Sequence, residues 1–221
     1  MFEYKNNQKI VTLIFGSLKT IVYFWGMQIF VINRQDRPER RKHIMEELEK
    51  QSLNAHLYPA KINKIGWMGC RDSHLSLLVK IYAEEFAGMI AEDDCKFIED
   101  FDVAALAMLE LPEDWDMLSL GASPQEPQVR YSPSLYKLSK SWCTHAMIWN
   151  PRKGGAVEAI LQADDNHEIG KYDVFLSEKI YPNFNCFLVR PLVCTQENFQ
   201  SDIARRSDVG TIAVNYARFC E

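Results

Sequence analysis

Three adjacent acidic residues, Glu92, Asp93 and Asp94, directly follow a short apolar run at positions 88–91. Neighbouring carboxylates repel one another, so keeping all three ionised near a strand end requires a cation or strong hydrogen-bond donors. Oxygen-only ligation suits Mg²⁺ or Mn²⁺, which also bind phosphate oxygens. The triplet therefore predicts a metal site that could neutralise a diphosphate leaving group. From spacing alone, a solvated acidic turn is an equally good interpretation.

The other candidate polar residues each have a structural and a functional interpretation. Arg40 could bind phosphate, or could pair with a glutamate at helical spacing as many surface arginines do. His74 and His145 could belong to a site, although an isolated histidine more often has a local structural role. The chain contains no P-loop, nucleophile elbow or H-E-x-x-H motif.

The first half of the chain alternates between strand and helix patterns. Residues 28–33 (QIFVIN) have the β-branched and aromatic content of a buried strand, and residues 55–58 are a second strand candidate. Asp36 is expected to cap a following helix, with Pro38 in its first turn and Glu39 completing a capping box. Ser73 is expected to cap the next helix.

The second half continues this alternation. Strands are predicted at 88–91, 116–120 and 145–149, a helix at 103–109, and an aperiodic surface loop at 122–133. Asn150 and Pro151 are expected to start another helix. Such alternation predicts an α/β fold with a mixed, mostly parallel sheet flanked by helices. Ligands of such sheets bind beyond the carboxyl ends of the strands, which singles out residues 33–41 and 92–94.

Composition limits the classes of function. The 221 residues, 47% of them hydrophobic, are expected to form a single domain over 27–221. A net charge of −5 and the lack of long basic runs argue against nucleic acid as a partner. The six cysteines show no C-x-x-C spacing and are expected to be reduced and mostly buried.

Residues 1–26 are predicted to be an N-terminal extension, which is interpreted either as sequence upstream of a translation start at Met27 or as a weakly membrane-associated segment. Their apolar stretches are interrupted by Lys19 and are shorter than the roughly 20 residues that a membrane span needs, so an anchor is the minority interpretation. We expect a cytoplasmic protein for which peripheral membrane association is allowed but not required.

Six segments of the chain together resemble glycosyltransferase family 25, the lipopolysaccharide-biosynthesis and collagen-galactosyltransferase type. The similarity covers most of residues 28–180 in the expected order, which is more specific than any single block. The segments are IFVINRQDRPERRKHIMEELEKQ (29–51), GCRDSHLSLL (69–78), MIAEDDCKF (89–97), WDMLSLG (115–121), THAMIWNPRKGGAVEAIL (144–161) and YDVFLSE (172–178).

The resemblance implies a GT-A type fold, a UDP-sugar donor such as UDP-galactose, a glycan or glycoconjugate acceptor and an inverting mechanism. By analogy Asp94, with Glu92 and Asp202, would hold Mn²⁺ or Mg²⁺. Asp173 would be the general base; its alternative interpretation is a helix cap. The nucleotide-sugar contacts implied by the resemblance are Ile32, Asn33, Arg40, Ser73, His74, Glu92, Asp93, Gly121 and His145.

Two other classes of function remain open from the sequence. One is a nucleotide-sugar-binding module that has lost catalysis, against which the intact acidic triplet argues. The other is a metal-dependent phosphoryl-transfer or hydrolytic enzyme, which would also use clustered carboxylates.

Overall fold

The computed structural model describes residues 27–152, 155–199 and 209–220, with only the backbone given for 209–213. The predicted extension at 1–26 and Asp202 both lie outside these residues. Within the described ranges, no helix combines the length and the apolar character that crossing a bilayer requires.

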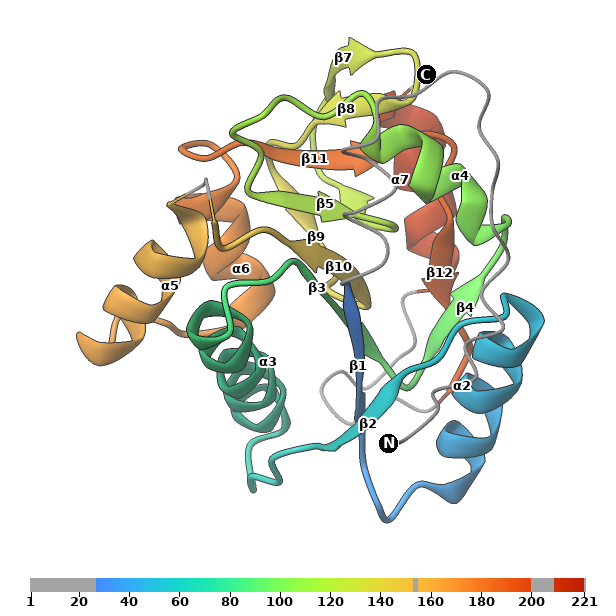
Figure 1. Cartoon of the computed structure of the whole chain (residues 1–221), viewed down its shortest axis with the longest axis vertical. Helices are drawn as coiled ribbons and strands as arrows, with labels where there is room; N and C mark the ends of the chain where they lie inside the picture. Colours follow the sequence, from blue (N-terminus) through green and yellow to red (C-terminus); the bar gives the residue numbers. More distant parts are fainter. Residues whose placement is uncertain (1–26, 153–154, 200–208, 221) are drawn as a thin grey trace, which may run out of the picture.

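A mixed sheet forms the centre of the protein (Figure 1). Among the described residues it has eight strands, in which β1 pairs in parallel with β2 and β3, β5 pairs in parallel with β11, and the other neighbours are antiparallel. In spatial order the strands are β2 (His56–Pro59), β1 (Gln28–Asn33), β3 (Gly88–Glu92), β10 (Ala146–Trp149), β5 (Met117–Ser119), β11 (Cys186–Val189), β8 (Leu135–Lys137) and β7 (Val129–Ser132).

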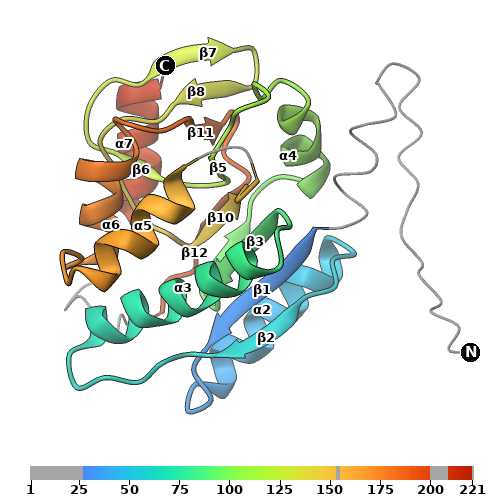
Figure 2. The ribbon, with the colours of Figure 1, turned by 60° about the vertical axis from the view of Figure 1, so that its left-hand side comes forward.

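Helices cover both faces of this sheet (Figure 2). Strand side chains alternate between the faces, so Phe30 and Ile32 join one apolar cluster while Ile29 and Val31 join the other. The first face carries α3 (Gly66–Ala83), α5 (Ala156–Asp165), α6 (Tyr172–Phe175) and the π-helical turn η1 (Leu176–Ile180); the second carries α2 (Pro38–Lys50) and α4 (Phe101–Met108). The predicted α/β class with a mixed sheet flanked by helices is confirmed, but among the described strands of this sheet antiparallel pairings outnumber the parallel ones that were predicted to dominate.

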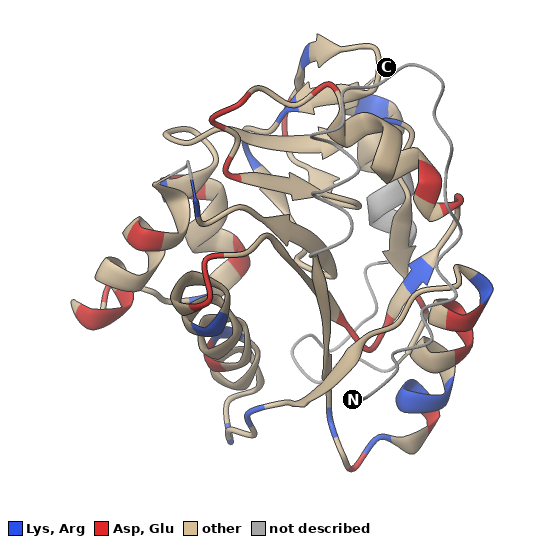
Figure 3. Cartoon of the chain, viewed as in Figure 1, with Lys and Arg blue, Asp and Glu red and all other residues tan. Residues whose placement is uncertain are grey.

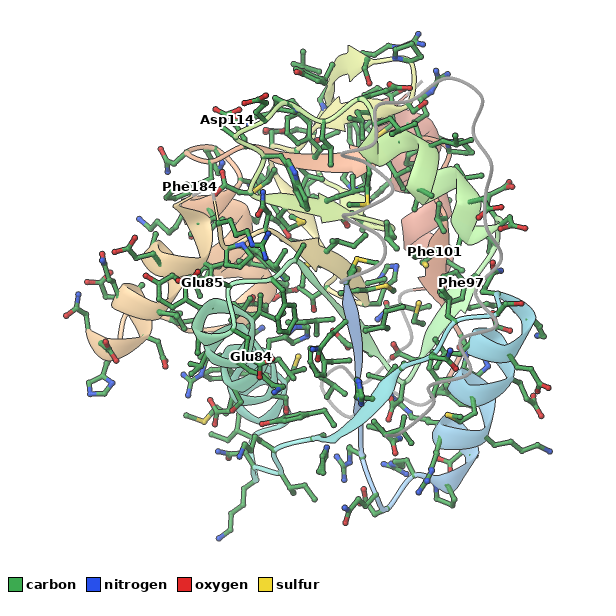
Figure 4. The ribbon with its side chains drawn as sticks, viewed as in Figure 1. Glu84, Glu85, Phe97, Phe101, Asp114 and Phe184 are labelled. Atoms are coloured by element: carbon green, nitrogen blue, oxygen red, sulfur yellow. The ribbon has the colours of Figure 1, made fainter. Side chains whose placement is uncertain are left out.

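Smaller elements close the ends of the sheet. Strand β4 (Cys95–Phe97) pairs with β12 (Cys194–Gln196), and β6 (Ser123–Pro124) pairs with β9 (Ser141–Trp142). Phe97 and Phe101, labelled in Figure 4, join β4 to α4 through an edge-to-face contact with ring centroids 6.3 Å apart. Helix α7 (Val209–Cys220) packs against β6. No disulfide links the six cysteines, all of which lie in the described ranges.

The strand directions gather one set of chain segments at a single edge. Ile32 on β1 is the partner of Glu92 on the parallel strand β3, so both strands end at the same level. Strand β10 runs the opposite way and begins there, next to His145, whose carbonyl accepts from the Glu92 amide. Strand β5 is antiparallel to β10 and therefore also ends there, just before Gly121. The sheet thus places these segments together although they are far apart in sequence.

Two predicted helix caps are wrong. Asp36 does not cap α2: its carboxylate accepts hydrogen bonds from the Arg34 side chain at 2.7–3.0 Å, and Arg37 occupies the cap position. Pro38 is the first helical residue, as predicted. Ser73 lies in the interior of α3, where its hydroxyl donates to the Gly69 carbonyl at 2.6 Å, because the helix begins earlier than the apolar spacing suggested.

Two predictions in the second half also need correction. Helix α5 begins at Ala156 rather than at Pro151, because the Asn150 side chain is used in a turn: its Nδ2 donates to the Trp115 carbonyl and its Oδ1 accepts from the Arg152 backbone N–H. The segment 122–133 is not wholly a loop, since it contains β6 and β7. Strand β6 has only two residues, one of them proline, and β7 is short and mostly exposed. Neither strand therefore shows the alternation of apolar and polar residues from which a strand is predicted.

The buried carboxylate of Asp116 ties α5 to the sheet. One of its oxygens accepts from the Ala156 amide at the start of α5, and the other accepts from the Asn185 amide just before β11, both at 2.8 Å. Asp116 is only 3% exposed. Orphan amides at a helix start require such an acceptor, so this side chain helps fix the helix position.

We therefore expect Asp116→Ala to lower the free energy of unfolding by about 3 kcal/mol, since hydrogen bonds to a charged group contribute about 1.5–3 kcal/mol each. Urea unfolding measures this change. The matched control is Asp114→Ala, which removes an exposed carboxylate labelled in Figure 4 and should cost under about 1 kcal/mol. If both variants lowered the free energy of unfolding equally, the proposed role of the Asp116 hydrogen bonds in fixing α5 would be contradicted.

Candidate functional site

A cavity of about 140 Å³ opens at the edge where β1, β2 and β3 end. Figure 3 shows the acidic stretch at the turn from β3 to β4 that forms part of its wall. The lining residues that were predicted from the sequence are Ile32, Arg40, Ser73, His74, Glu92, Asp93 and Asp94; the others are Arg34, Ala60, Lys61, Ile62, Asn63, Gly66, Gly69, Cys70 and Gln196. The triplet is therefore a cavity wall and not a solvated turn.

Asp93 is the anchor between β3 and the loop after β1. Its Oδ2 accepts from the Asn33 side-chain amide at 2.9 Å and from the Arg34 backbone amide at 3.1 Å. Its Oδ1 accepts from Arg40 Nη1 at 3.1 Å. The Arg40 guanidinium in turn lies over the Phe199 ring, 5.3 Å from its centroid. Asp93 is thus fully engaged, and its role in the structure is to hold Arg40 and Asn33 in place.

Glu92 is held from two other elements. Its Oε1 lies 3.1 Å from His74 Nε2 on α3 and accepts from the Thr144 hydroxyl at 2.7 Å. Burial alone would raise the pKa of Glu92, but the His74 and Thr144 hydrogen bonds and the charge of His74 hold it at about 2. The Glu92 carboxylate therefore stays ionised at any physiological pH.

Asp94 is the carboxylate with the least compensation. Its Oδ2 is 3.5 Å from Arg40 Nη1, while its Oδ1 is buried without a hydrogen-bond partner among the described residues. Burial and the neighbouring charge of Glu92 raise the pKa of Asp94 from 3.8 to about 8, against the opposing charge of Arg40. Such an oxygen favours a proton or a bound cation.

Asp173 is not one of the residues that line the cavity. It is the second residue of α6, and its Oδ1 accepts from the Val174 amide, so the N-cap position belongs to Lys171. Burial raises the pKa of Asp173, and the charge of Glu92 raises it further. The preceding residue, Tyr172, stacks on His74 with ring centroids 4.9 Å apart. The fold therefore brings Asp173 into the electrostatic neighbourhood of the triplet.

Gly121 and His145 form a buried layer behind Glu92, outside the cavity. A Cβ on Gly121 would lie 2.1 Å from the Cys194 carbonyl oxygen and 2.4 Å from His145 Nε2, so only glycine fits. His145 Nε2 lies 3.4 Å from that same carbonyl, and burial lowers the pKa of His145. We interpret both as supports of the site, and not as donor contacts.

The loop after β2 forms the opposite wall against α3. The Lys61 amide donates to the Ser73 hydroxyl at 2.8 Å, and a Cβ on Gly69 would lie 2.5 Å from the Lys61 carbonyl oxygen. Gly69 thus permits the close approach of this loop to the helix, and Ser73, which also lines the cavity, fixes the loop there.

Several cavity residues were not predicted from the sequence. Lys61 could have been found, because it follows a predicted strand and the carboxyl-end rule applies to it. Cys70 could also have been found, since it lies four residues before His74 on one helix face. Thr144 begins one of the six segments that carry the family resemblance but was given no role, and Gln196 has no local signal in the sequence.

Comparisons with known proteins give little further information. No protein-family model matches the chain, and no curated protein matches it significantly. Among solved structures, the chain is similar to the crystal structure of mannose-1-phosphate geranyltransferase from Thermus thermophilus. The sequences are 11% identical, the TM-score is 0.45, and the match covers 74% of this chain and 73% of that chain. So distant a similarity carries no functional argument.

The raised pKa of Asp94 predicts an unusual dependence of stability on pH. A carboxyl group whose pKa is higher in the folded state stabilises the fold while it is protonated. This contribution is complete below its unfolded pKa near 3.8 and is lost as the pH rises to about 8.

In buffer with a chelator, we expect Asp94→Asn to be more stable than the wild type near pH 8, with the difference shrinking as the pH falls toward 4. Urea unfolding across this pH range measures it. The exposed control Asp165→Asn should follow the wild-type curve. A pH-independent offset between Asp94→Asn and the wild type would contradict the assignment.

Proposed function

We propose that the protein is a glycosyltransferase of the family 25 type, with a GT-A type fold, that transfers a hexose from a UDP-sugar to a glycan or glycoconjugate acceptor. The observation that carries the proposal is the buried, unpartnered Oδ1 of Asp94 at the edge of a cavity that also contains basic side chains. The sequence resemblance over residues 28–180 supports the same interpretation.

The charges around the cavity suit a donor diphosphate. Arg34, Arg40 and Lys61 all line it, and Arg40 lies directly beside the acidic triplet. Arginine and lysine are the usual phosphate-binding side chains, and Arg40 is already held in position by Asp93. At about 140 Å³ the cavity is smaller than the roughly 300–1,000 Å³ of pockets that enclose a whole ligand. It would therefore hold the phosphates or the sugar, with the base along the exposed loop after β2.

The residues present fit a divalent cation of the hard, oxygen-seeking class. The unpartnered Asp94 oxygen lies beside two further carboxylates, and an all-oxygen set is what Mn²⁺ or Mg²⁺ prefers. Asp94 would hold the ion; Glu92 is the second candidate, although His74 and Thr144 already engage its Oε1. When bound, the cation would neutralise charge on the leaving diphosphate.

Asp173 is the proposed general base. An inverting transfer needs a group that accepts the acceptor hydroxyl proton, and such a base works best when its pKa is near the working pH. Burial and the charge of Glu92 move the pKa of Asp173 upward in that direction. Its place on α6, next to the face of α3 that carries His74, would put the acceptor between α6 and the cavity mouth.

The competing functions make different demands on the same cavity. A binding module without catalysis would bind UDP with metal but transfer no sugar. A metal-dependent phosphoryl-transfer or hydrolytic enzyme would release phosphate and would not require Asp173. Metal-dependent UDP binding and sugar transfer to an acceptor therefore distinguish the three functions.

For donor binding, we expect UDP to stabilise the wild type only when Mn²⁺ is present, by about 2.7 kcal/mol at a UDP concentration 100-fold above its Kd. GDP and CMP should have smaller effects. Thermal shift measures this, and Asp94→Asn should fold but lose the metal-dependent gain while Asp165→Asn keeps it. If UDP with Mn²⁺ stabilised Asp94→Asn as much as the wild type, the assignment of Asp94 as a metal ligand would be wrong.

For transfer, we expect Asp173→Asn to bind UDP and Mn²⁺ as the wild type does while its turnover falls by about 10² or more, the scale of a lost acid or base. Turnover is measured by mass spectrometry with a donor and acceptor found by screening. Glu178→Gln, an exposed change on the adjoining turn η1, is the matched control. If turnover fell in Glu178→Gln and not in Asp173→Asn, the base would be Glu178.

A further inference from the structure

Three side chains of different chemistry converge on the floor of the cavity. Cys70 and His74 lie four residues apart on α3, so they share one face of the helix, and Glu92 ends the neighbouring strand β3. One potential ligand atom from each lies within 4.8 Å of the other two. All three residues line the cavity, so an ion could reach them from solvent.

From this geometry we propose that Cys70, His74 and Glu92, the last through Oε1, form a binding site for a thiophilic divalent cation of the zinc class, separate from the Asp94 oxygen assigned to the hard cation. A sulfur, a nitrogen and an oxygen ligand suit Zn²⁺ or Co²⁺, whereas Mn²⁺ and Mg²⁺ prefer oxygen alone. Three protein ligands and one open position are the arrangement of zinc sites that remain accessible to water or substrate. The proposal does not depend on sugar transfer.

The spacing of the ligand atoms is compatible with such an ion. His74 Nε2 and Glu92 Oε1 are 3.1 Å apart. Bonds of about 2.0–2.1 Å at a tetrahedral angle place neighbouring ligand atoms roughly 3.3–3.4 Å apart, so only a small outward movement would admit the ion. His74 Nε2 and Glu92 Oε1 form a hydrogen bond when no ion is present, and the same two atoms would be neighbouring ligands of a bound ion.

The surroundings of these residues have the features of a prepared site. The His74 side chain is fully buried and stacks on Tyr172, so its ring orientation is fixed. Glu92 accepts from Thr144, and such outer hydrogen bonds orient ligands around metals.

Cobalt substitution tests the proposal directly on the full chain. Chelator-treated protein titrated with Co²⁺ should develop a thiolate-to-metal charge-transfer band, and added Zn²⁺ should abolish it. In Cys70→Ser the band should be absent, and the Co²⁺ affinity should fall by more than the roughly 10–100-fold that loss of an outer-shell partner costs. Cys143→Ser changes the other partly exposed cysteine and should keep the band.

One further variant separates this site from the proposed donor site. Asp94→Asn should keep the cobalt band while losing Mn²⁺-dependent UDP stabilisation. No band in the wild type, a band that survives in Cys70→Ser, or one lost in Cys143→Ser would overturn the proposal. Loss of the band in Asp94→Asn would overturn the claim of two separate sites.

Discussion

The arrangement of the site depends on how the negative charge of three consecutive carboxylates is compensated at a buried sheet edge. The charge of each carboxylate is compensated by different groups. Asp93 is neutralised by Arg40 and by two amide donors, while Glu92 is held by His74 and Thr144. Asp94 has a long contact to Arg40 and a side-chain hydrogen bond with Gln196, yet burial and the charge of Glu92 raise its pKa to about 8. The negative charge of Asp94 is therefore incompletely compensated, and this is the physical basis for proposing a cation there. The cation in turn is the basis for proposing a phosphorylated donor.

The sheet produces this situation through strand direction. Strands β1 and β3 are parallel and end together, whereas β10 is antiparallel and begins at the same edge. Donors from the first loop, from α3 and from the start of β10 therefore meet the triplet from three sides. The packing behind it is tight, since Gly121 leaves no room for a Cβ beside Cys194 and His145. Such a scaffold can hold like charges together because its strands cannot easily separate.

Much of the fold and of the site could be predicted from the sequence where an apolar strand is followed directly by polar residues. The strands at 28–33 and 88–91 were clear from their apolar content, and the carboxyl-end rule brought Asn33 and Arg40 to the triplet. Helix starts were less accurate, because Asp36 and Ser73 have cap-forming side chains that are used in an ion pair and inside a helix instead. Strands β4, β8, β9, β11 and β12 were missed, since two to four residues carry no periodicity. Whether Asp202 contributes stays a prediction, as it lies outside the described residues.

The most direct test is a crystal of the protein with Mn²⁺ and UDP, measured at a wavelength where manganese scatters anomalously. The account predicts an anomalous peak within bonding distance of an Asp94 carboxylate oxygen, with diphosphate density on the side of the cavity that carries Arg40 and Lys61. An Asp94 carboxylate that contacts only water, with no anomalous peak at the end of β3 under saturating Mn²⁺ and UDP, would contradict it.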